Sequence, residues 1–412
     1  MKNKSVINII DAVAFILALL ASAVAMFVLF YRQAFSDSVT WLSDMPAYIS
    51  EMLGTNTKFS FPYPVLFKTA KLINYLAPSP EFAMALAVTL LNILAMIIVK
   101  IVFTKQTNAR LLATFAIMCL FFCSMIYSDL FKAVGIPERY AGVYSPNPWH
   151  NHTYMAARPF MILAFVMGAI VLQNYEKDFA KSQKITKDII CKYVVFACSI
   201  LLVTLAKPSY TIVHMASSGI VMLYRLFKNS FKTLRQTVFL GICYIPTIID
   251  LLYQFGGVFT GTSVAGDENG IGIALFEVWR EYSHNIPISI VLAAAFPLVV
   301  LLFHWRDIKS DYQYRYSWQV YLAGLIMGAI LVEKGFREYH GNFLWGYICG
   351  LFIVFMSSIV LVLRDTIKVI SEKLLLTKAM IKPLVEWGFL GVHTLLGLKY
   401  FYELTVYGCY YL

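Results

Sequence analysis

Polar side chains are concentrated in residues 147–160, NPWHNHTYMAARPF, although the chain as a whole is apolar. Imidazole and amide groups can orient a polar ligand or exchange a proton with it, and a guanidinium can pair with a phosphate. Anchoring at a membrane surface would account for the Trp and the Arg but not for the His-Asn-His run. We therefore interpret the stretch as part of a binding site. Its candidate residues are Trp149, His150, Asn151, His152 and Arg158.

A second cluster of charged residues lies between two apolar segments, in EKGFREYHGNFLWGY, residues 333–347. This connection is too short to form a solvated domain, so some of its charges must lie near the lipid headgroups. An unpaired charge costs about 2.5–3.5 kcal/mol at the centre of a spanning helix, and a bound anion would offset part of such a cost. A salt-bridge cluster with a purely structural role is the alternative. The candidate binding residues here are Arg337, Glu338, His340 and Asn342.

Four further candidates lie outside these two clusters. Asp44 and Glu51 belong to WLSDMPAYISEML, residues 41–53, where a carboxylate could remove a proton from a substrate hydroxyl. A helix N-terminal cap is the alternative role for Asp44. Lys207 could bind a phosphate if it faces a cavity, or it could simply extend to the membrane surface. Asp250 is a candidate because an acid inside an apolar segment is costly and usually has a function.

Long apolar helices must position these residues. Of the 412 residues, 59% are hydrophobic and 14% are charged, compared with about 25% charged residues in a soluble domain. Apolar runs of about 20 residues recur along the chain, which is typical of helices that cross a bilayer. We predict an all-α, polytopic helical membrane protein with a single transmembrane domain over residues 1–412. The eleven expected membrane segments are 7–31, 81–103, 111–127, 159–173, 192–206, 211–224, 237–255, 286–304, 318–333, 347–363 and 384–402.

The distribution of Lys and Arg predicts which loops share a side of the membrane. With the N-terminus in the cytoplasm, 22 of the 34 Lys and Arg residues fall in inner loops and 11 in outer loops, as the positive-inside rule requires. The candidate residues then lie at or near the outer face. The first outer loop is expected to contain two amphipathic helices along the membrane surface. The outer loops expected to form the site are 32–80, 128–158, 256–285 and 334–346.

Basic inner loops also explain the net charge of +11, so nucleic-acid binding is not expected. The seven cysteines lie mostly inside apolar runs, and no spacing of Cys and His indicates a zinc site. No cofactor is predicted with a defined set of ligands, and a divalent metal stays an option. The inner loops themselves are expected to be basic connectors without chemistry.

The order of these features resembles that of the GT-C glycosyltransferases, membrane enzymes that take sugars from polyprenyl-phosphate carriers. In that superfamily a first helix precedes a long outer loop with two interfacial helices, and an acidic residue near the start of the loop is the catalytic base. Asp44 in SDMPAYISEM occupies that place, with Glu51 as the reserve, and FPYPVLFKTAKLI is similar to the start of the second interfacial helix. The topology is similar throughout, and the specific motifs lie within residues 41–76.

The resemblance implies an inverting transfer of a sugar to a cell-envelope glycan or a lipid-linked acceptor, on the outer face of a bacterial plasma membrane. Asp44 would act as the base, and the departing lipid phosphate would be stabilised by Lys207, Arg158 and Arg337. The residues that would orient the sugar or the acceptor are His150, His152, His340 and Asn342. The expected partners are the polyprenyl-phosphate-linked donor, the acceptor and membrane lipids. The chain has no DxD motif of the oligosaccharyltransferase kind, so a metal requirement is left open.

Three other functions fit the same features. An O-antigen-type polymerase or ligase would work without an acidic base, through Arg158, Arg337, His150 and His340. A membrane acyltransferase would need a histidine in a lipid-facing tunnel reached from the inside, and His304 stands alone near that face. A non-enzymatic lipid or glycan transporter would show internal repeats and helices broken at the midplane of the bilayer.

Overall fold

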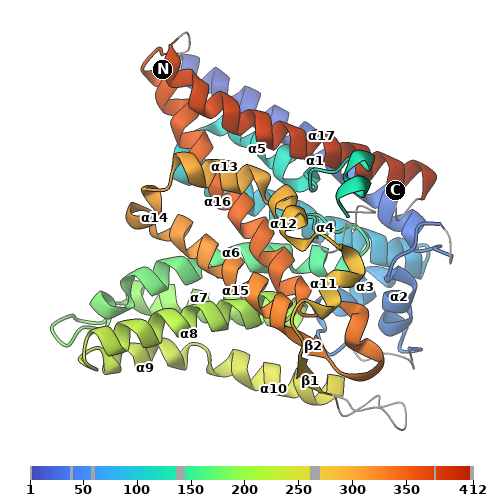
Figure 1. Ribbon diagram of the computed structural model, residues 1–412, viewed down its shortest axis with the longest axis horizontal. Coiled ribbons are helices and arrows are strands. Elements are labelled where there is room, and N and C mark those ends of the chain that lie inside the picture. The colour runs from blue at the N-terminus through green and yellow to red at the C-terminus, as the bar shows by residue number, and fades with distance from the viewer. Residues whose placement is uncertain are drawn as a thin grey trace.

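The computed structural model describes residues 2–37, 40–56, 61–135, 144–259, 270–374 and 377–408, without the side chains of 2–7, 258–259 and 336–337. Helices form nearly all of its secondary structure (Figure 1). The long helices are α1 (Lys2–Gln33), α4 (Pro80–Thr107), α6 (His152–Asp178), α7 (Lys187–Ala206), α8 (Ser209–Lys228), α15 (Tyr312–Ile330), α16 (Leu344–Ser371) and α17 (Ile381–Tyr407). Two pairs are bent, α9 (Leu234–Ile242) with α10 (Ile245–Phe259) by 53° and α12 (Ile286–Ala293) with α13 (Ala295–Phe303) by 70°.

The apolar helices are of the kind that cross membranes. Within the described part of the chain, five segments are long and apolar enough to do so, or up to seven if each bent pair is one span. Each of the eleven segments predicted from the sequence lies largely on one helix or one bent pair, so the predicted all-α class is confirmed. The five segments are Asn8–Gln33, Pro80–Thr107, His152–Asp178, Lys187–Ala206 and Glu338–Ser371.

One predicted segment, 111–127, is longer than the helix that forms there. Helix α5 (Arg110–Phe122) ends early because the chain then bonds to α17. The N–H of Ser124 donates to the carbonyl of His393 at 3.0 Å, and Nδ1 of His393 lies 2.6 Å from the carbonyl oxygen of Ser124. A Cβ at Gly397 would lie 1.8 Å from the Phe122 carbonyl oxygen, so only glycine permits this approach. Tertiary hydrogen bonds therefore decide where α5 ends.

A short antiparallel sheet replaces the end of predicted segment 318–333. Strand β2 (Leu331–Glu333) pairs with β1 (Ile271–Ile273), with Ile271 opposite Glu333. The pairing satisfies backbone groups at the end of α15 that would otherwise be unbonded. It also joins the chain before α11 (Glu277–Tyr282) to the connection between α15 and α16.

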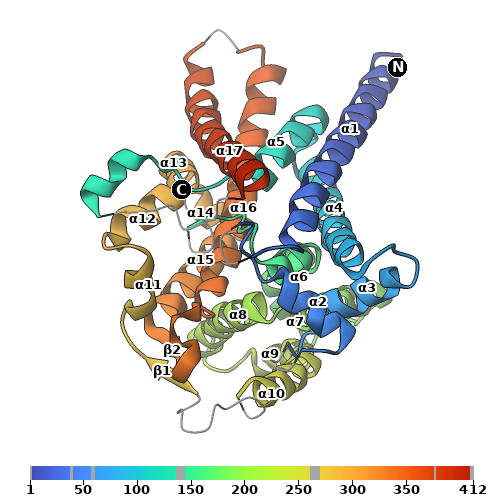
Figure 2. The same cartoon turned by 90° about the vertical axis from the view of Figure 1, so that its right-hand side faces the viewer.

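Helix α16 runs through the middle of the molecule (Figures 1 and 2), and its apolar part is completely buried. Helix α15 approaches it so closely that glycine is required at the contact. A Cβ at Gly324 would lie 2.6 Å from the carbonyl oxygen of Gly346, and one at Gly350 would lie 2.7 Å from the Cα of Tyr321. Small residues at such contacts let helices pack tightly in lipid, where the hydrophobic effect does not drive them together. The α15–α16 pair is therefore tightly packed at the centre of the molecule.

The molecule has two different ends, at opposite sides of Figure 1. We call one the loop-rich end, because both strands lie there together with α2 (Met45–Leu53), α3 (Val65–Asn74), α11 and η2 (Gly335–His340). The other, the N-terminal end, carries the start of α1, the α6–α7 connection, α14 (Asp307–Ser310) and η3 (Lys378–Met380). Helices α2 and α3 lie in loop 32–80, and their expected position along a membrane surface stays a prediction. A further short helix, η1 (Asp129–Val134), follows α5.

Candidate functional site

Asp44 immediately precedes α2, and its carboxylate faces the start of α6. Oδ2 of Asp44 accepts hydrogen bonds from the Tyr48 hydroxyl and from the Asn151 side-chain amide, each at 3.0 Å. The Asp44 side chain makes no capping hydrogen bond to the backbone of α2, so the capping role is not the one it has. Tyr48 can reach Asp44 because it lies one helical turn further along α2. Two neutral donors therefore fix the orientation of this carboxylate.

The surroundings of Asp44 raise the pKa of its carboxyl above the ordinary value of 3.8. The dense protein around the group disfavours its charge, and this effect outweighs the hydrogen bonds from Tyr48 and Asn151 and the positive charge of Lys207. The residue nevertheless remains open to solvent. A carboxylate of this kind is more basic than usual and is accessible to a substrate.

Lys207 lies in the turn between α7 and α8, and its side chain is buried. The ammonium donates hydrogen bonds to Oδ1 of Asn151 at 3.2 Å and to Oγ1 of Thr153 at 3.0 Å. It also lies 4.7 Å from the centre of the Trp345 ring. Burial lowers the pKa of Lys207 to about 8, although the charge of Asp44 opposes this shift. Among the described residues the bonded partners of this cation are neutral, so an anionic ligand would stabilise it.

Asn151 connects the carboxylate to the ammonium. Its Nδ2 donates to Asp44 while its Oδ1 accepts from Lys207. Asn151 is also the N-cap of α6, where the same oxygen accepts from the Tyr154 N–H at 3.0 Å and from the Thr153 hydroxyl at 2.9 Å. The cap fixes which side of the amide faces each group. A single residue thereby sets the relative positions of Asp44 and Lys207, and we call these three residues the Asp44 site.

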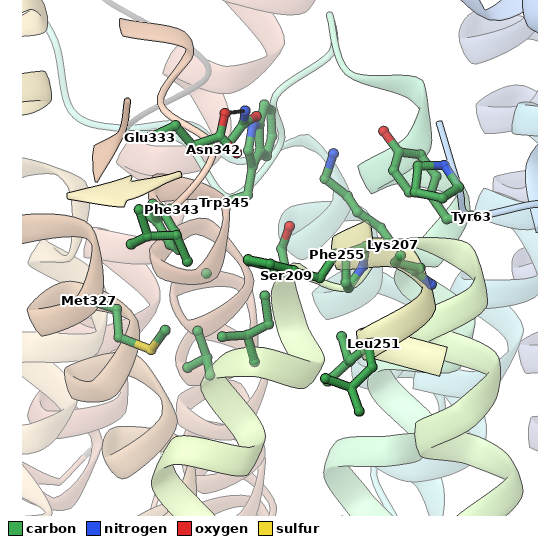
Figure 3. Close-up of a pocket in the computed structure, with 18 residues that line it drawn as sticks. Tyr63, Lys207, Ser209, Leu251, Phe255, Met327, Glu333, Asn342, Phe343 and Trp345 are labelled. Atoms are coloured by element: carbon green, nitrogen blue, oxygen red, sulfur yellow. Dashed lines mark hydrogen bonds between the residues drawn. The ribbon is translucent and has the colours of Figure 1, made fainter. Parts of the chain in front are cut away.

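The Lys207 side chain reaches the polar end of a cavity of about 350 Å³ (Figure 3). Glu333 and Asn342 lie at the same end and are joined by a hydrogen bond of 2.7 Å from the amide of Asn342 to Oε2 of Glu333. Figure 3 shows the Lys207 ammonium extending between the rings of Tyr63 and Trp345. Most of the wall is apolar, with side chains from α8, α10 and α15. These apolar residues include Ile212, Val213, Leu251, Leu252, Phe255 and Met327.

Two of the candidate histidines lie around the Asp44 site. His150 is buried against Trp345, with 5.7 Å between the ring centres, and burial lowers the pKa of His150 to about 3. Its imidazole is therefore neutral at physiological pH. His340 is exposed at the end of η2, and it lies near enough to Asp44 for its charge to favour the ionised carboxylate. The structure thus brings together six of the predicted residues, Asp44, His150, Asn151, Lys207, His340 and Asn342.

Trp149 and Arg158 belong to the core rather than to the cavity wall. Trp149 is 1% exposed, and its ring centre lies 4.8 Å from that of Phe401 in α17. The guanidinium of Arg158 is fully buried and donates to the Pro146 carbonyl at 2.9 Å and to Oδ1 of Asn147 at 2.6 Å. These contacts hold the chain that leads into α6. Neither residue is among those that line the cavity.

Two more candidates bond to neighbours away from the cavity. Nε2 of His152 lies 2.8 Å from Oε1 of Gln33, which ties the first turn of α6 to α1. Oε2 of Glu51 accepts a hydrogen bond of 2.8 Å from Asn56 just beyond α2. Glu51 therefore bonds to a neighbour in sequence, whereas Asp44 bonds to Asn151.

The last three candidates lie on α10 and η2. Asp250 accepts a hydrogen bond of 2.8 Å from Gln254, and Gln254 in turn lines the cavity. Glu338 is half-buried on η2. Arg337 is also on η2, but its side chain lies outside the described residues.

Four residues contribute to the site although the motifs did not single them out for it. Tyr48 could have been found, because it is four residues after Asp44 on an expected helix. Thr153 lies within the polar stretch 147–160, two residues after Asn151. Tyr63 and Trp345 carry no comparable signal, since only the folded chain brings Tyr63, in the segment before α3, and Trp345 of α16 close to Lys207.

Comparisons with protein family models, with curated proteins and with solved structures found no match for this chain. The chemistry of the site is therefore the basis for inferring its function. An accessible, basic carboxylate lies beside a buried cation at the polar end of an apolar cavity. Such a site can bind an amphiphile by its anionic headgroup and deprotonate a hydroxyl next to it.

Proposed function

We propose that the protein is a membrane glycosyltransferase of the GT-C type, which moves a sugar from a polyprenyl-phosphate carrier to a cell-envelope glycan or a lipid-linked acceptor. One observation carries the proposal. The solvent-open Asp44 is separated by a single amide from Lys207, a buried lysine at the polar end of an apolar cavity. The base and the phosphate partner that the reaction needs are thus on neighbouring sides of Asn151.

The cavity suits the lipid-linked donor. Its volume of about 350 Å³ lies at the lower end of the range of about 300–1,000 Å³ for small-molecule sites. Apolar walls favour an isoprenoid chain, because burying hydrocarbon releases about 25 cal/mol per Å². A phosphate at the polar end would pair with Lys207, and the flat faces of Tyr63 and Trp345 would contact the sugar ring.

The reaction would proceed by direct displacement. Asp44 takes the proton of an acceptor hydroxyl, and the oxygen attacks the anomeric carbon from the face opposite the phosphate. The bond between that carbon and the phosphate oxygen breaks, and its electron pair stays on the phosphate. Lys207 stabilises the negative charge that develops there, an effect worth about 10²–10³-fold in rate for a single preorganised donor. The sugar leaves with inverted configuration.

The raised pKa of Asp44 supports its assignment as the base, because a more basic carboxylate accepts a proton more readily. Tyr48 and Asn151 hold it in place by donating to one carboxylate oxygen. The competing polymerase or ligase would use Arg158 together with Arg337, His150 and His340. The guanidinium of Arg158 donates to backbone and amide oxygens in the core. The contacts of Arg158 therefore favour the transferase over this alternative.

We further propose eleven membrane crossings with the N-terminus in the cytoplasm of a bacterium. The loop-rich end would then lie on the outer face of the plasma membrane. Support comes from the excess of Lys and Arg, 22 against 11, in the connections on the other side. A donor could reach the cavity sideways from the outer leaflet, and an acceptor could reach Asp44 from solvent.

The proposal is tested with purified protein in vesicles that contain a panel of synthetic polyprenyl-phosphate hexoses. Mass spectrometry measures the polyprenyl phosphate released when hydroxyl acceptors are added. The wild type should release it in an acceptor-dependent manner, and Asp44→Asn should not. Equal release by both proteins would remove the proposed base. Failure of the wild type to bind polyprenyl phosphate at all would remove the glycosyltransferase proposal.

A further inference from the structure

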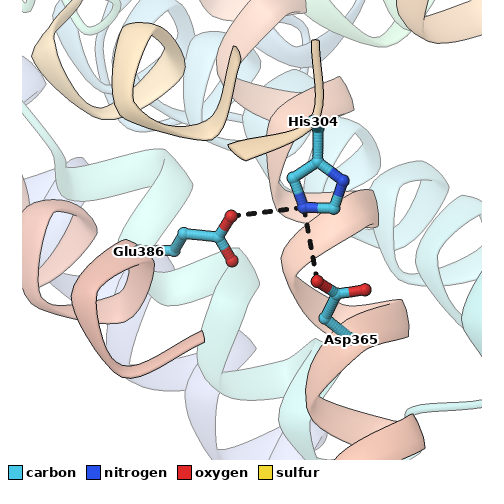
Figure 4. A group of neighbouring side chains, drawn as sticks. All are labelled: His304, Asp365 and Glu386. Atoms are coloured by element: carbon cyan, nitrogen blue, oxygen red, sulfur yellow. Dashed lines mark ion pairs between the residues drawn. The ribbon is translucent and has the colours of Figure 1, made fainter. Parts of the chain in front are cut away.

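A cluster of ionisable side chains (Figure 4) lies at the N-terminal end, where α13 leads into α14 (Figure 1). His304 follows α13, Asp365 belongs to α16 and Glu386 belongs to α17. Nε2 of His304 lies 3.2 Å from Oε1 of Glu386 and 3.4 Å from Oδ2 of Asp365. Figure 4 shows both carboxylates pointing at this one nitrogen. Asp307 and Lys382 complete the group, which we call the His304 cluster.

The buried carboxylate of Glu386 needs a positively charged neighbour. Glu386 is 0% exposed, and neither of its carboxylate oxygens accepts a hydrogen bond of normal geometry from the described residues. An ionised carboxylate in this position is costly unless a cation compensates it. Its side chain is aimed into the space that it shares with His304 and Asp365. This unsatisfied acid is what distinguishes the cluster from an ordinary group of surface acids.

The partners of His304 leave Nε2 available as a ligand. Nδ1 of His304 lies 2.7 Å from Oδ2 of Asp307, the distance of a hydrogen bond in which the ring donates to a carboxylate. Metal-bound histidines usually donate their second ring nitrogen to a carboxylate in this way, which fixes the tautomer. The lone pair of Nε2 then faces two carboxylates. A positive charge is required between them.

With a neutral His304 ring, the charge balance of the cluster fits a divalent ion. With a neutral imidazole, Asp307, Asp365 and Glu386 contribute three negative charges, and Lys382 contributes one positive charge through its contact of 2.7 Å with Oδ2 of Asp365. The neighbouring Asp311 is neutralised by Arg364 at 2.6 Å. The cluster is therefore left with two uncompensated negative charges, which one divalent cation would cancel.

Two of the three separations between the ligand atoms also fit a metal. Zinc bonds to histidine nitrogen and carboxylate oxygen at about 2.1 Å, so the ligands of a tetrahedral site lie about 3.4 Å apart. The observed contacts of 3.2 and 3.4 Å agree with this spacing. A cavity of about 310 Å³, lined by His304, Asp307 and Asp365 among others, gives the ion an entry path and space for water ligands.

We propose that His304, Asp365 and Glu386 bind a divalent transition-metal ion, Zn²⁺ or Mn²⁺, at the N-terminal end. Imidazole nitrogen with carboxylate oxygens is a ligand set that suits these two ions. Because the ligands come from the residue that follows α13 and from α16 and α17, the ion joins the ends of these helices. The site is independent of the proposed sugar transfer, which takes place at the loop-rich end.

The full-length protein, purified without a histidine tag and stripped with a chelator, tests the site with Zn²⁺ or Mn²⁺ alone. Calorimetry and elemental analysis should give one ion per chain, and the ion should raise the melting temperature. Glu386→Gln keeps the shape of the side chain but removes one ligand charge, so it should weaken binding at least tenfold. Asp311→Asn is the matched control, because Asp311 lines the same cavity but pairs with Arg364. It should bind the ion as the wild type does.

Three results would overturn the proposal. The first is a wild type that binds no ion, in which case the required charge is a proton on His304. The second is an equal affinity in Glu386→Gln and the wild type. The third is an equal loss of affinity in Asp311→Asn and Glu386→Gln. If Glu386→Gln does not fold, Asp365→Asn removes a ligand at the edge of the same cluster and is measured in its place.

Discussion

The loop-rich end and the N-terminal end each bury an ionisable side chain, but the two buried charges have opposite signs. At the loop-rich end, a buried lysine donates hydrogen bonds to the neutral oxygens of Asn151 and Thr153, and the nearby Asp44 carboxylate does not bond to it directly. At the N-terminal end, the buried carboxylate of Glu386 is left in a group with excess negative charge. The first end is suited to an anion and the second to a cation. In both sites burial makes an uncompensated charge costly, and the sign of that charge determines which kind of ion we expect to bind.

The largest effect is expected from removing the proposed base. Asp44→Asn keeps the hydrogen-bond contacts of the side chain but cannot accept a proton, so transfer should fall by about 10³-fold, within the range of general base catalysis. The rate of polyprenyl phosphate release measures this loss. Asp129→Asn, which changes an exposed acid paired with Lys132, is the control and should keep the wild-type rate. Activity in Asp44→Asn would mean that the loop-rich end acts without an acidic base.

A substitution of Trp149 tests whether this residue belongs to the core or to the Asp44 site. Trp149→Ala should lower the free energy of unfolding by about 3–5 kcal/mol, because it empties a buried aromatic site. The ring packs against Phe401, Phe122 and Phe30. Thermal unfolding in detergent measures the effect. A variant with wild-type stability and no sugar transfer would show that Trp149 contributes to substrate binding and not to the core.

Lys207 should matter for the phosphate and little for the acceptor. Lys207→Met has a similar length and no charge, so transfer should fall by about 10²-fold, and binding of polyprenyl phosphate should weaken with it. Lys68→Met, at an exposed lysine of α3, is the matched control. A titration with polyprenyl phosphate in nanodiscs measures the affinity of each variant. Equal affinities would show that the phosphate lies elsewhere.

The smallest expected effect is the change of the transfer rate with pH. It can be told apart from a change in stability, because the two should respond to pH in opposite directions. Lys207 must be protonated to hold the phosphate, so the transfer rate should fall about tenfold per unit above a pH of about 8. Stability should change in the opposite direction. Between about pH 8 and 10.5 the unfolded chain binds the proton that folded Lys207 has lost, so the contribution of this group to stability rises with pH. Lys207→Met should lose the alkaline limb of the rate profile, and a limb that persists would belong to another group.

The sequence predicted most of the Asp44 site because its members carry local signals. Asp44 follows the first long helix, Asn151 precedes an apolar segment, and Lys207 stands in a polar turn between two apolar runs. Each of them lies at a helix boundary, and the loops between the expected helices meet at one end. Helix periodicity and charge patterns were therefore sufficient to bring these three residues together.

Residue type alone did not distinguish site residues from core residues. Trp149 and Arg158 lie in the same stretch as Asn151 but point into the core, and their direction depends on packing against α5, α16 and α17. The His304 cluster was missed for a related reason. Its three proposed ligands come from the residue that follows α13, from α16 and from α17. They are spread over residues 304–386, so no local spacing in the sequence indicates them. Loops expected to be basic connectors lie next to this cluster.

The position of a bound polyprenyl phosphate tests the central claim most directly. Cryo-electron microscopy of the protein in nanodiscs with this lipid would locate the headgroup and the start of its tail. We expect the phosphate within hydrogen-bond distance of Lys207 Nζ, with the tail along the apolar wall formed by α8, α10 and α15. A phosphate bound away from Lys207, or a cavity that stays empty at saturating lipid, would contradict the proposed function.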